Sequence, residues 1–379
     1  MKVLVVARGY LDKENPVGNF EFDQALALKK TGCDVRVLAF DARNVLHSKA
    51  IGVREYLYRD VKIYGIAIPF YFLPKEIYFL IANNVACSFF QKHILNEWSP
   101  DIIHAHFGNC AANLVKTVEK YSIPFCVTEH FSGLNQLQPN QTYYQFAKKA
   151  YEKADLRIAV SNDFKDRLEQ LTNLDFHVIG NLLDPDIFND EFQISSDKRT
   201  DGQTHIISAG NLTKNKSFDL LMDVVGQMKH DVKLDIYGSG AEREYLQNKI
   251  QTDNLSDKVV LHDRVSRKEL VERYQQSDLF VLLSKKETFG VVFIEAMACG
   301  LPVVSSHCGG TDDIITGDKY GIIVEQSDPI CIAAEIDQLI DHLREYDRSD
   351  ISMSTMDRFG YRAILSRLMP LYQECIENN

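Results

Sequence analysis

Two glutamates, Glu287 and Glu295, stand out because the second lies in the otherwise apolar stretch TFGVVFIEAMACGLPVV, residues 288–304. The apolar run before them, DLFVLLS (278–284), predicts a buried strand, so Glu287 falls in a strand-to-helix loop and Glu295 in the helix that Gly290 opens. At about 1.5 Å per residue the carboxylates can lie up to ~12 Å apart, roughly the length from a sugar ring across a diphosphate to a ribose. Backbone N–H groups at the start of this helix favour anionic oxygens. The pattern therefore predicts a diphosphate site, and the alternative is two solvated glutamates.

Strands and helices alternate along the chain in two series that would position these residues. The first series has strands at 2–7, 34–40, 101–107, 124–130, 156–161 and 177–181, with a helix at 20–30. The second has strands at 204–210, 232–238, 258–263, 278–284 and 301–306, with helices near 217–229, 241–251, 266–276, 291–299 and 329–345. Such alternation predicts parallel sheets covered by helices on both faces. A polar connector (189–204) separates the series, and an amphipathic helix (357–376) follows the second. Two α/β domains are expected, with a ligand at the carboxyl ends of the strands.

Length and composition restrict the class of protein. The chain has 379 residues, more than one hydrophobic core usually serves. A net charge of −11 argues against nucleic acid as a partner. The N-terminal MKVLVVAR predicts a core strand rather than a signal peptide, and the longest apolar stretch (66–90) is interrupted by Pro74, Lys75 and Glu76. Eight cysteines without a C-x-x-C pair indicate free thiols, so a cytoplasmic protein is expected.

The run E287-TFGVVFI-E295 followed by AMACGLPVVSS resembles the E-x7-E signature of family-four retaining glycosyltransferases. The resemblance extends, in the family's order, to NPVGNFEFDQALAL (15–28), DIIHAH (101–106), VTEHFSG (127–133), VIGNLLDPDIF (178–188) and AGNLTKNKSFDLL (209–221). It implies the GT-B architecture, an α/β fold of two facing Rossmann-like domains. Residues 1–182 would bind the acceptor and be completed by a returning helix in 357–379, and residues 183–356 would bind the nucleotide-sugar donor.

The resemblance also implies roles for individual residues. Glu287 would contact the donor sugar, Glu295 the ribose hydroxyls, and Lys216 the leaving diphosphate. Gly18 would let backbone approach the phosphates, and His130 would lie beside the reacting centre. The other expected donor-site residues are Asn211, Gly238, Arg264, Thr288, Phe289, Gly290 and Val291, and the residues expected on the acceptor side are His104 and His106.

The expected reaction is the retaining transfer of a sugar from a nucleoside-diphosphate sugar, UDP-sugar before GDP-sugar. The expected acceptor is a sugar or a lipid-linked glycan in surface polysaccharide synthesis. Breaking a sugar–phosphate bond builds negative charge on the diphosphate, which a fixed cation and helix N–H groups stabilise. The resemblance implies no metal and no cofactor, and Asp184 and Asp186 are interpreted as turn residues. The family's phosphate-loop arginine is replaced by Asn211, so Lys214 or Arg264 would have to supply that charge.

Several alternatives stay open. A nucleotide-sugar epimerase such as a UDP-N-acetylglucosamine 2-epimerase, or a non-catalytic partner subunit, could share the architecture. His104, His106 and His130 could hold zinc, because alternate strand residues face one side, or could serve in strand-end packing. YGSGAER (237–243) is similar to a dinucleotide fingerprint but lacks its third glycine. The aromatic residues of 66–90 could pack internally or form a peripheral membrane lip.

Overall fold

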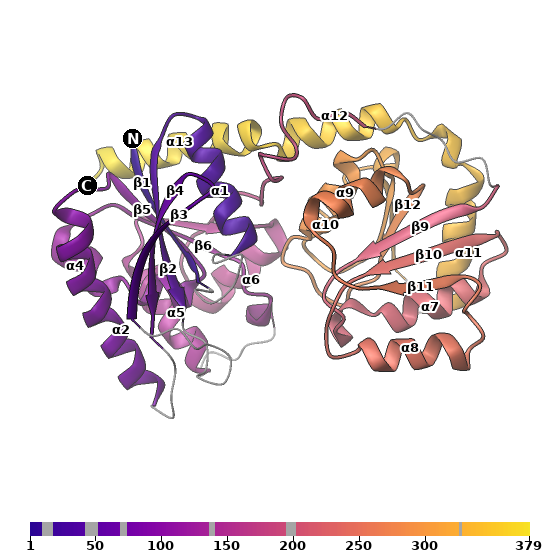
Figure 1. Cartoon of the computed structure of the whole chain (residues 1–379), viewed down its shortest axis with the longest axis horizontal. Coiled ribbons are helices and arrows are strands. Elements are labelled where there is room, and N and C mark those ends of the chain that lie inside the picture. The colour runs from indigo at the N-terminus through magenta and orange to yellow at the C-terminus, as the bar shows by residue number, and fades with distance from the viewer. Residues whose placement is uncertain (10–17, 42–51, 69–73, 136–140, 195–201, 326–327) are drawn as a thin grey trace. The chain divides into compact units, whose positions relative to one another are not determined.

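The computed structural model describes the whole chain except residues 10–17, 42–51, 69–73, 136–140, 195–201 and 326–327. The described residues form two compact units, one of Met1–Pro185 with Tyr361–Asn379 and one of Asp186–Gly360 (Figure 1). Each unit is built around its own sheet, of eight strands in the first and six in the second.

The first sheet has the order β3-β4-β2-β1-β5-β6-β7-β8. Its centre is β1 (Lys2–Arg8), which pairs in parallel with β2 (Asp34–Asp41) on one side and β5 (Ile102–His106) on the other. Both faces of these strands are covered, which is why their sequences are almost continuously apolar. The remaining strands are β3 (Gly52–Tyr58), β4 (Val61–Ala67), β6 (Phe125–Glu129), β7 (Leu156–Ala159) and β8 (His177–Val178).

Helices surround this sheet, and the last helix of the chain is one of them. They are α1 (Asn19–Lys30), α2 (Lys75–Phe89), the π-helix η1 (Phe90–Leu95), α3 (Gly108–Ala112), α4 (Val115–Tyr121), the 3-10 turn η2 (Ser132–Asn135), α5 (Thr142–Lys153), α6 (Asn162–Thr172) and α13 (Tyr361–Glu377). The buried Tyr372 of α13 packs edge-on against His104 of β5, with ring centroids 5.6 Å apart. The expected return of the C-terminal helix to the first domain is confirmed. Its start is corrected, because Gly360 is extended (φ −60°, ψ 152°) and residues 357–359 end the preceding helix.

The edge of the first sheet carries a hairpin that the strand pattern did not predict. β3 runs antiparallel to β4, so the sheet is not purely parallel. The two connecting residues, Arg59 and Asp60, both have positive φ (47° and 58°), as a tight two-residue hairpin turn requires. Neither is glycine or asparagine, so the sequence carried little turn signal.

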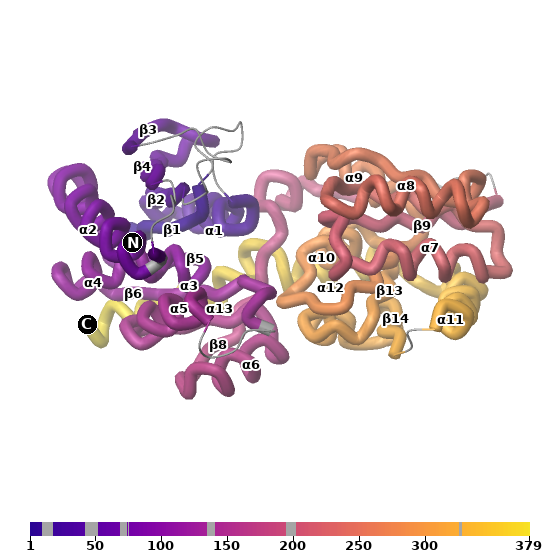
Figure 2. Tube along the Cα trace, turned by 90° about the horizontal axis from the view of Figure 1, so that it is seen from below, coloured from indigo at the N-terminus to yellow at the C-terminus, as the bar shows by residue number. Residues whose placement is uncertain are grey.

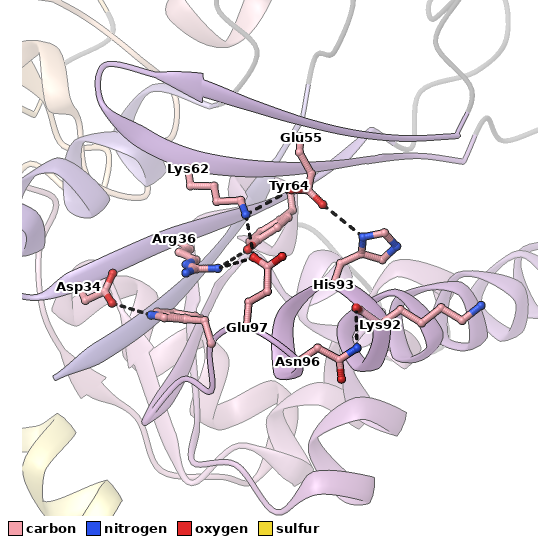
Figure 3. A network of polar contacts seen from close by, with 10 residues as sticks. Asp34, Arg36, Glu55, Lys62, Tyr64, Lys92, His93, Asn96 and Glu97 are labelled. Atoms are coloured by element: carbon pink, nitrogen blue, oxygen red, sulfur yellow. Dashed lines mark hydrogen bonds and ion pairs between the residues drawn. The ribbon is translucent and has the colours of Figure 1, made fainter.

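A polar network attaches this hairpin to the segment after α2 (Figure 3). Lys62 of β4 lies 3.2 Å from the carboxylates of both Glu55 and Glu97. Arg36 of β2 stacks over Trp98, with 4.8 Å between the guanidinium carbon and the ring centroid, and lies 3.9 Å from Glu97. These ion pairs are partly exposed, so each contributes only about 0–1 kcal/mol.

The aromatic residues of 66–90 mostly pack internally where the structure describes them. Tyr78, Phe89 and Phe90 are buried, and Phe79 stacks on Phe146 with centroids 3.8 Å apart. Phe70, Tyr71 and Phe72 lie outside the described residues. Within the described ranges, every helix is too short or too polar to cross a bilayer.

The second sheet has the order β11-β10-β9-β12-β13-β14, with all strands parallel. Its strands are β9 (Thr204–Ala209), β10 (Val232–Tyr237), β11 (Val259–His262), β12 (Leu279–Leu282), β13 (Val303–Ser306) and β14 (Gly321–Val324). Its helices are η3 (Lys214–Lys216), α7 (Phe218–Gln227), α8 (Arg243–Thr252), α9 (Arg267–Gln275), α10 (Val291–Ala298), η4 (Asp318–Tyr320), α11 (Pro329–Asp341), η5 (Leu343–Glu345) and α12 (Arg348–Phe359). Figure 1 shows α7 and α8 below the strands of this sheet and α10 and α12 above them, and Figure 2 views the unit from the side of α7 and α8.

Arg348 at the start of α12 joins the ends of two helices. Its guanidinium donates to the carbonyl oxygens of Gln275 (3.3 Å), the last residue of α9, of Ser277 (3.1 Å) just after it, and of Cys299 (3.3 Å) after α10. These carbonyls have no partner within their helices, so a single arginine satisfies the ends of two elements that carry site residues.

Candidate functional site

The loops that carry the predicted donor residues meet at the switch point of the second sheet. After β9 the chain continues to β10 on one side, and after β12 it continues to β13 on the other. Ligands of open α/β sheets bind at such a point, beyond the carboxyl ends of the strands. The loops after β9 and β12 carry Lys216 and Glu287, so the strand order places both predictions at one edge.

Lys216 and Glu287 form an ion pair across the switch point. The Lys216 ammonium bonds to Oε1 of Glu287, with the two side chains only 17% and 12% exposed. Asn215 joins the same loops. Its side-chain amide donates to the Lys286 carbonyl (2.8 Å), and its backbone carbonyl accepts from the Lys285 N–H (2.8 Å). Lys216 and Glu287 were both predicted for the site, but the contact between them was not.

A third loop, after β13, fixes the backbone of Glu287. The Glu287 N–H donates to the Cys308 carbonyl (2.9 Å), and the Gly310 N–H donates to the Glu287 carbonyl (3.1 Å). A Cβ on Gly310 would lie 2.5 Å from the Phe289 nitrogen, so only glycine allows this approach. The Phe289 ring is buried against Phe359, which leaves only its backbone to contact a ligand.

The helix after this loop begins as predicted. Gly290 has a positive φ of 99° and precedes Val291, the first residue of α10. Its N-cap residue, Gly290, has no side chain that could cap the helix. Thr288 lies in the same loop, partly exposed. The start of α10 therefore presents backbone N–H groups beside the Lys216–Glu287 pair, as an anion site needs.

Glu295 is buried in α10 and paired with an arginine that sequence reasoning missed. Nε of Arg267, the first residue of α9, lies 2.9 Å from Glu295 Oε1. Burial, with the Glu295 charge as a second cause, raises the pKa of Tyr274 well above its usual range. No motif marks Arg267, because its contact joins two helices whose packing is a property of the fold. Both acids of the E-x7-E pattern are thus paired with a cation.

The other predicted donor-site residues of the second unit are Gly238, Asn211 and Arg264, and among the residues that the structure describes none of these three forms a hydrogen bond or ion pair with Lys216 or Glu287. Gly238 is explained by packing, because a Cβ there would lie 2.1 Å from the Gly210 carbonyl oxygen of the loop after β9. The Leu212 N–H donates to the Ser239 carbonyl (2.9 Å), which binds the same two loops. Asn211 and Arg264 are exposed, and so is Lys214. The glycines of YGSGAER therefore serve loop packing, and dinucleotide binding is not needed to explain them.

The three histidines of the first unit form a stack at the carboxyl ends of β5 and β6. Ring centroids are 4.6 Å apart between His104 and His106 and 5.1 Å between His106 and His130. Nδ1 of His106 lies 2.8 Å from Nε2 of His130. Burial lowers the pKa of His106 to about 3 and holds those of His104 and His130 well below 6.5. In the part of the chain that the structure describes, no three His, Cys, Asp or Glu side chains are grouped to hold a metal ion.

His104 belongs to the packing of the first unit, one of the three roles considered for it, beside an acceptor contact and a zinc ligand. Its Nδ1 bonds to Gln24 (2.7 Å) and Tyr372, and its Nε2 to Thr128 (2.7 Å). Because both ring nitrogens are used and the ring is fully buried, His104 does not face an acceptor.

Glu129, which was not predicted, holds His130 in place. Its buried carboxylate accepts from the N–H groups of Gly108 (2.9 Å), His130 (2.8 Å) and Phe131 (2.8 Å). The Tyr151 hydroxyl also donates to it, and burial together with the Glu129 charge raises the pKa of Tyr151 well above its usual range. The strand end that carries His130 is therefore fixed by a fully hydrogen-bonded anion.

Comparison with known proteins agrees with this arrangement. Residues 17–187 match the family model Glycosyltransferase Family 4, and residues 189–350 match Glycosyl transferases group 1. The chain is 25% identical over 347 residues to TuaC of Bacillus subtilis, named as a glycosyltransferase of teichuronic acid biosynthesis, covering 86% of each chain.

Two solved structures share the fold over the whole length. Sucrose-phosphate synthase of Thermosynechococcus elongatus superposes with a TM-score of 0.80 at 19% identity, covering 100% of both chains. Alr3699/HepE of Anabaena, solved with UDP and glucose, gives a TM-score of 0.72 at 18% identity, covering 99% of this chain and 100% of that one. Both matching models describe glycosyltransferases, and neither describes an epimerase or a non-catalytic subunit. The chain is thus a group 1, family-four glycosyltransferase with the GT-B fold.

Proposed function

We propose that this glycosyltransferase transfers a sugar, with retention of configuration, from a nucleoside-diphosphate sugar to a sugar or lipid-linked acceptor in surface polysaccharide synthesis. The observation that carries the proposal is the Lys216–Glu287 pair at the switch point of the second sheet, beside the start of α10. A paired lysine at this edge is a fixed cation, and the helix start adds N–H donors.

In the proposed mechanism, different groups stabilise the leaving diphosphate, contact the sugar and bind the ribose. As the bond between the anomeric carbon and the phosphate oxygen breaks, negative charge grows on the diphosphate. The Lys216 ammonium and the N–H groups at the start of α10 stabilise that charge. Glu287 stays beside the sugar, and the buried Glu295, held by Arg267, accepts hydrogen bonds from the ribose hydroxyls. His130 serves at the reacting centre from the first unit.

UDP is the proposed nucleotide of the donor. Support comes from Alr3699/HepE, which binds UDP and glucose on the same fold. The surface-polysaccharide acceptor is supported by the name of TuaC. The proposed reaction uses no metal and no other cofactor, because Lys216 and α10 supply the positive potential. A cytoplasmic location is proposed with it.

The nucleotide proposal is tested by thermal unfolding with UDP, GDP and ADP, followed by incubation with the matching sugar donors. We expect UDP to raise the melting temperature most and a UDP-sugar to release UDP, equally well with and without EDTA. The configuration of the transferred sugar, read by NMR, should equal that of the donor. A chain that no nucleoside diphosphate stabilises, or an inverted product, contradicts the proposal.

A peripheral membrane contact is proposed for α2, with aliphatic rather than aromatic residues. Ile77, Leu80 and Ile81 are exposed on one stripe of this helix. Lysines of the neighbouring α4 flank it, since Lys116 bonds to the Asn84 side chain and Lys120 to Gln91 (3.1 Å). An apolar stripe bordered by cations suits an anionic bilayer surface.

Flotation with vesicles of phosphatidylglycerol and phosphatidylcholine checks this contact. Replacing Ile77, Leu80 and Ile81 by serine should weaken binding about ten-fold, because roughly 25 cal/mol is lost per Å² of apolar contact. Serine at the exposed Val260 and Ile330 of the second unit is the control and should leave binding unchanged. Wild-type protein that stays unbound rules the contact out.

A further inference from the structure

The first sheet has a switch point of its own. In the order β3-β4-β2-β1-β5-β6-β7-β8, the chain leaves β1 toward β2 on one side and leaves β5 toward β6 on the other. The position between β1 and β5 is therefore where an open α/β sheet binds a ligand. β1 ends there at Arg8, and β5 ends there at His106.

Arg8 is a cation held in a fixed orientation at this point. Its guanidinium carbon lies 3.9 Å from the ring centroid of Phe107, the residue that follows β5. Its Nε lies 3.0 Å from Oε1 of Glu21, in the first turn of α1. Although anchored on two sides, the Arg8 side chain is 39% exposed. A planar guanidinium that is stacked and paired in this way loses little freedom when it binds an anion.

Two buried atoms beside Arg8 have no hydrogen-bond partner among the residues that the structure describes. They are Oε2 of Glu21, whose side chain is 0% exposed, and Nε2 of His106, which is 1% exposed. A buried polar atom without a partner costs about 1–3 kcal/mol. Each such atom needs an explanation, and an unsatisfied group that a ligand can reach is one. The Arg8–Glu21 pair is thus poorly explained as a stabilising element, since it uses only one oxygen of a fully buried carboxylate.

Gly18 encloses the carboxylate. A Cβ on Gly18 would lie 2.2 Å from Glu21 Oε2, and the Gly18 N–H donates to the Arg8 carbonyl at 3.1 Å. Any larger residue would push Glu21 away from Arg8. The local reason for glycine at this position is therefore the geometry of the Arg8–Glu21 pair.

Aromatic rings complete the surroundings. The Phe20 ring lies 5.8 Å from the Arg8 guanidinium carbon and stacks at a tilt on His130, with centroids 4.6 Å apart. Arg8 can bind an anionic group, and the aromatic rings can pack on the apolar face of a sugar. Both lie next to His130, the proposed catalytic histidine.

From this geometry we infer that Arg8 binds the acceptor of the proposed reaction through a negatively charged group, a phosphate or a carboxylate, and that Glu21 is its positioning residue. This inference rests on the proposed function. The guanidinium fork matches both anions, and hydrogen bonds to charged groups contribute enough for at least a ten-fold preference over a neutral sugar.

The test measures binding of three probes, namely glucose 6-phosphate, glucuronate and glucose, by titration calorimetry with the enzyme saturated by UDP. Bound UDP keeps the phosphate probe out of the donor site. Wild-type protein should bind at least one anionic probe about ten-fold more tightly than glucose. The preferred probe distinguishes a phosphate group from a carboxylate. Arg8→Gln should abolish the preference, and Arg8→Lys should retain part of it.

Arg36→Gln is the matched control. Arg36 is also stacked on an aromatic ring and paired with a glutamate, but it lies near the beginning of β2, in the polar network of Figure 3. This variant should keep the full preference. Equal binding of all three probes, no binding of any at millimolar concentration, or an unchanged preference in an Arg8→Gln protein that still binds UDP would each overturn the inference. Failure of the wild type to bind UDP would instead count against the proposed function.

Discussion

Replacing Lys216 by alanine is expected to lower kcat at least 100-fold, about 2.7 kcal/mol of transition-state stabilisation. Lys216 is the cation paired with Glu287 at the switch point of the second sheet. Removing one preorganised group that faces a developing anion typically costs two to three orders of magnitude in rate. The measurement is the initial rate of UDP release from the preferred UDP-sugar, with kcat and KM determined separately.

Lys229→Ala is the control for this substitution. Lys229 follows the carboxyl end of α7 in the same unit, outside the predicted site residues, and its side chain is exposed. Its loss should change kcat less than about two-fold, because an exposed charge is screened by solvent. Lys216→Arg keeps the charge and should recover part of the rate. Unchanged kinetics in Lys216→Ala would remove this lysine from the proposed mechanism.

Acid is expected to unfold the first unit because its histidine stack is buried in the neutral form. Burial lowers the pKa of His106 to about 3 and those of His104 and His130 well below 6.5. The unfolded chain therefore takes up protons below pH 6.5 that the folded unit does not, and stability decreases as pH falls from 6.5 toward 3. Each such histidine contributes about 1.4 kcal/mol per pH unit, so His106 alone accounts for roughly 2.7 kcal/mol at pH 4.5.

Trp98 allows this loss to be measured in the first unit alone. It is the single tryptophan of the chain and is buried in that unit. Urea unfolding followed by its fluorescence should show a free energy of unfolding that falls between pH 6.5 and 4.5. His106→Phe keeps a ring in the stack and should flatten the dependence by about 1.4 kcal/mol per unit. His177→Gln, at an exposed position of β8, should not. A pH profile identical in all three proteins would show that His106 titrates normally.

The sequence predicted the two α/β series and the E-x7-E acids because both depend on local patterns. Apolar runs such as VLVV of β1 and the glycine before α10 specify an element from its own residues. The β3–β4 hairpin was missed because Arg59 adopts a positive φ, which is unusual for arginine, and no glycine or asparagine marks the turn. The antiparallel edge of the first sheet was missed with it.

Contacts between distant segments could not be predicted. Arg267 on Glu295, Glu129 under His130 and the Lys216–Glu287 pair each join elements that only the strand order brings together. For His104, a local pattern led to a wrong expectation. Its alternation with His106 on β5 indicated a shared surface, yet Gln24 and Tyr372 enclose it in the core.

The placement of α13 affects how the protein is made on the ribosome. Residues 1–185 emerge first, but their unit is completed by Tyr361–Asn379. Until those last residues have been translated, the nascent first unit lacks the helix that buries Tyr372 against His104. The second unit is one continuous segment, Asp186–Gly360, and needs no later residues to be complete. It can therefore fold before the first unit has received its last helix.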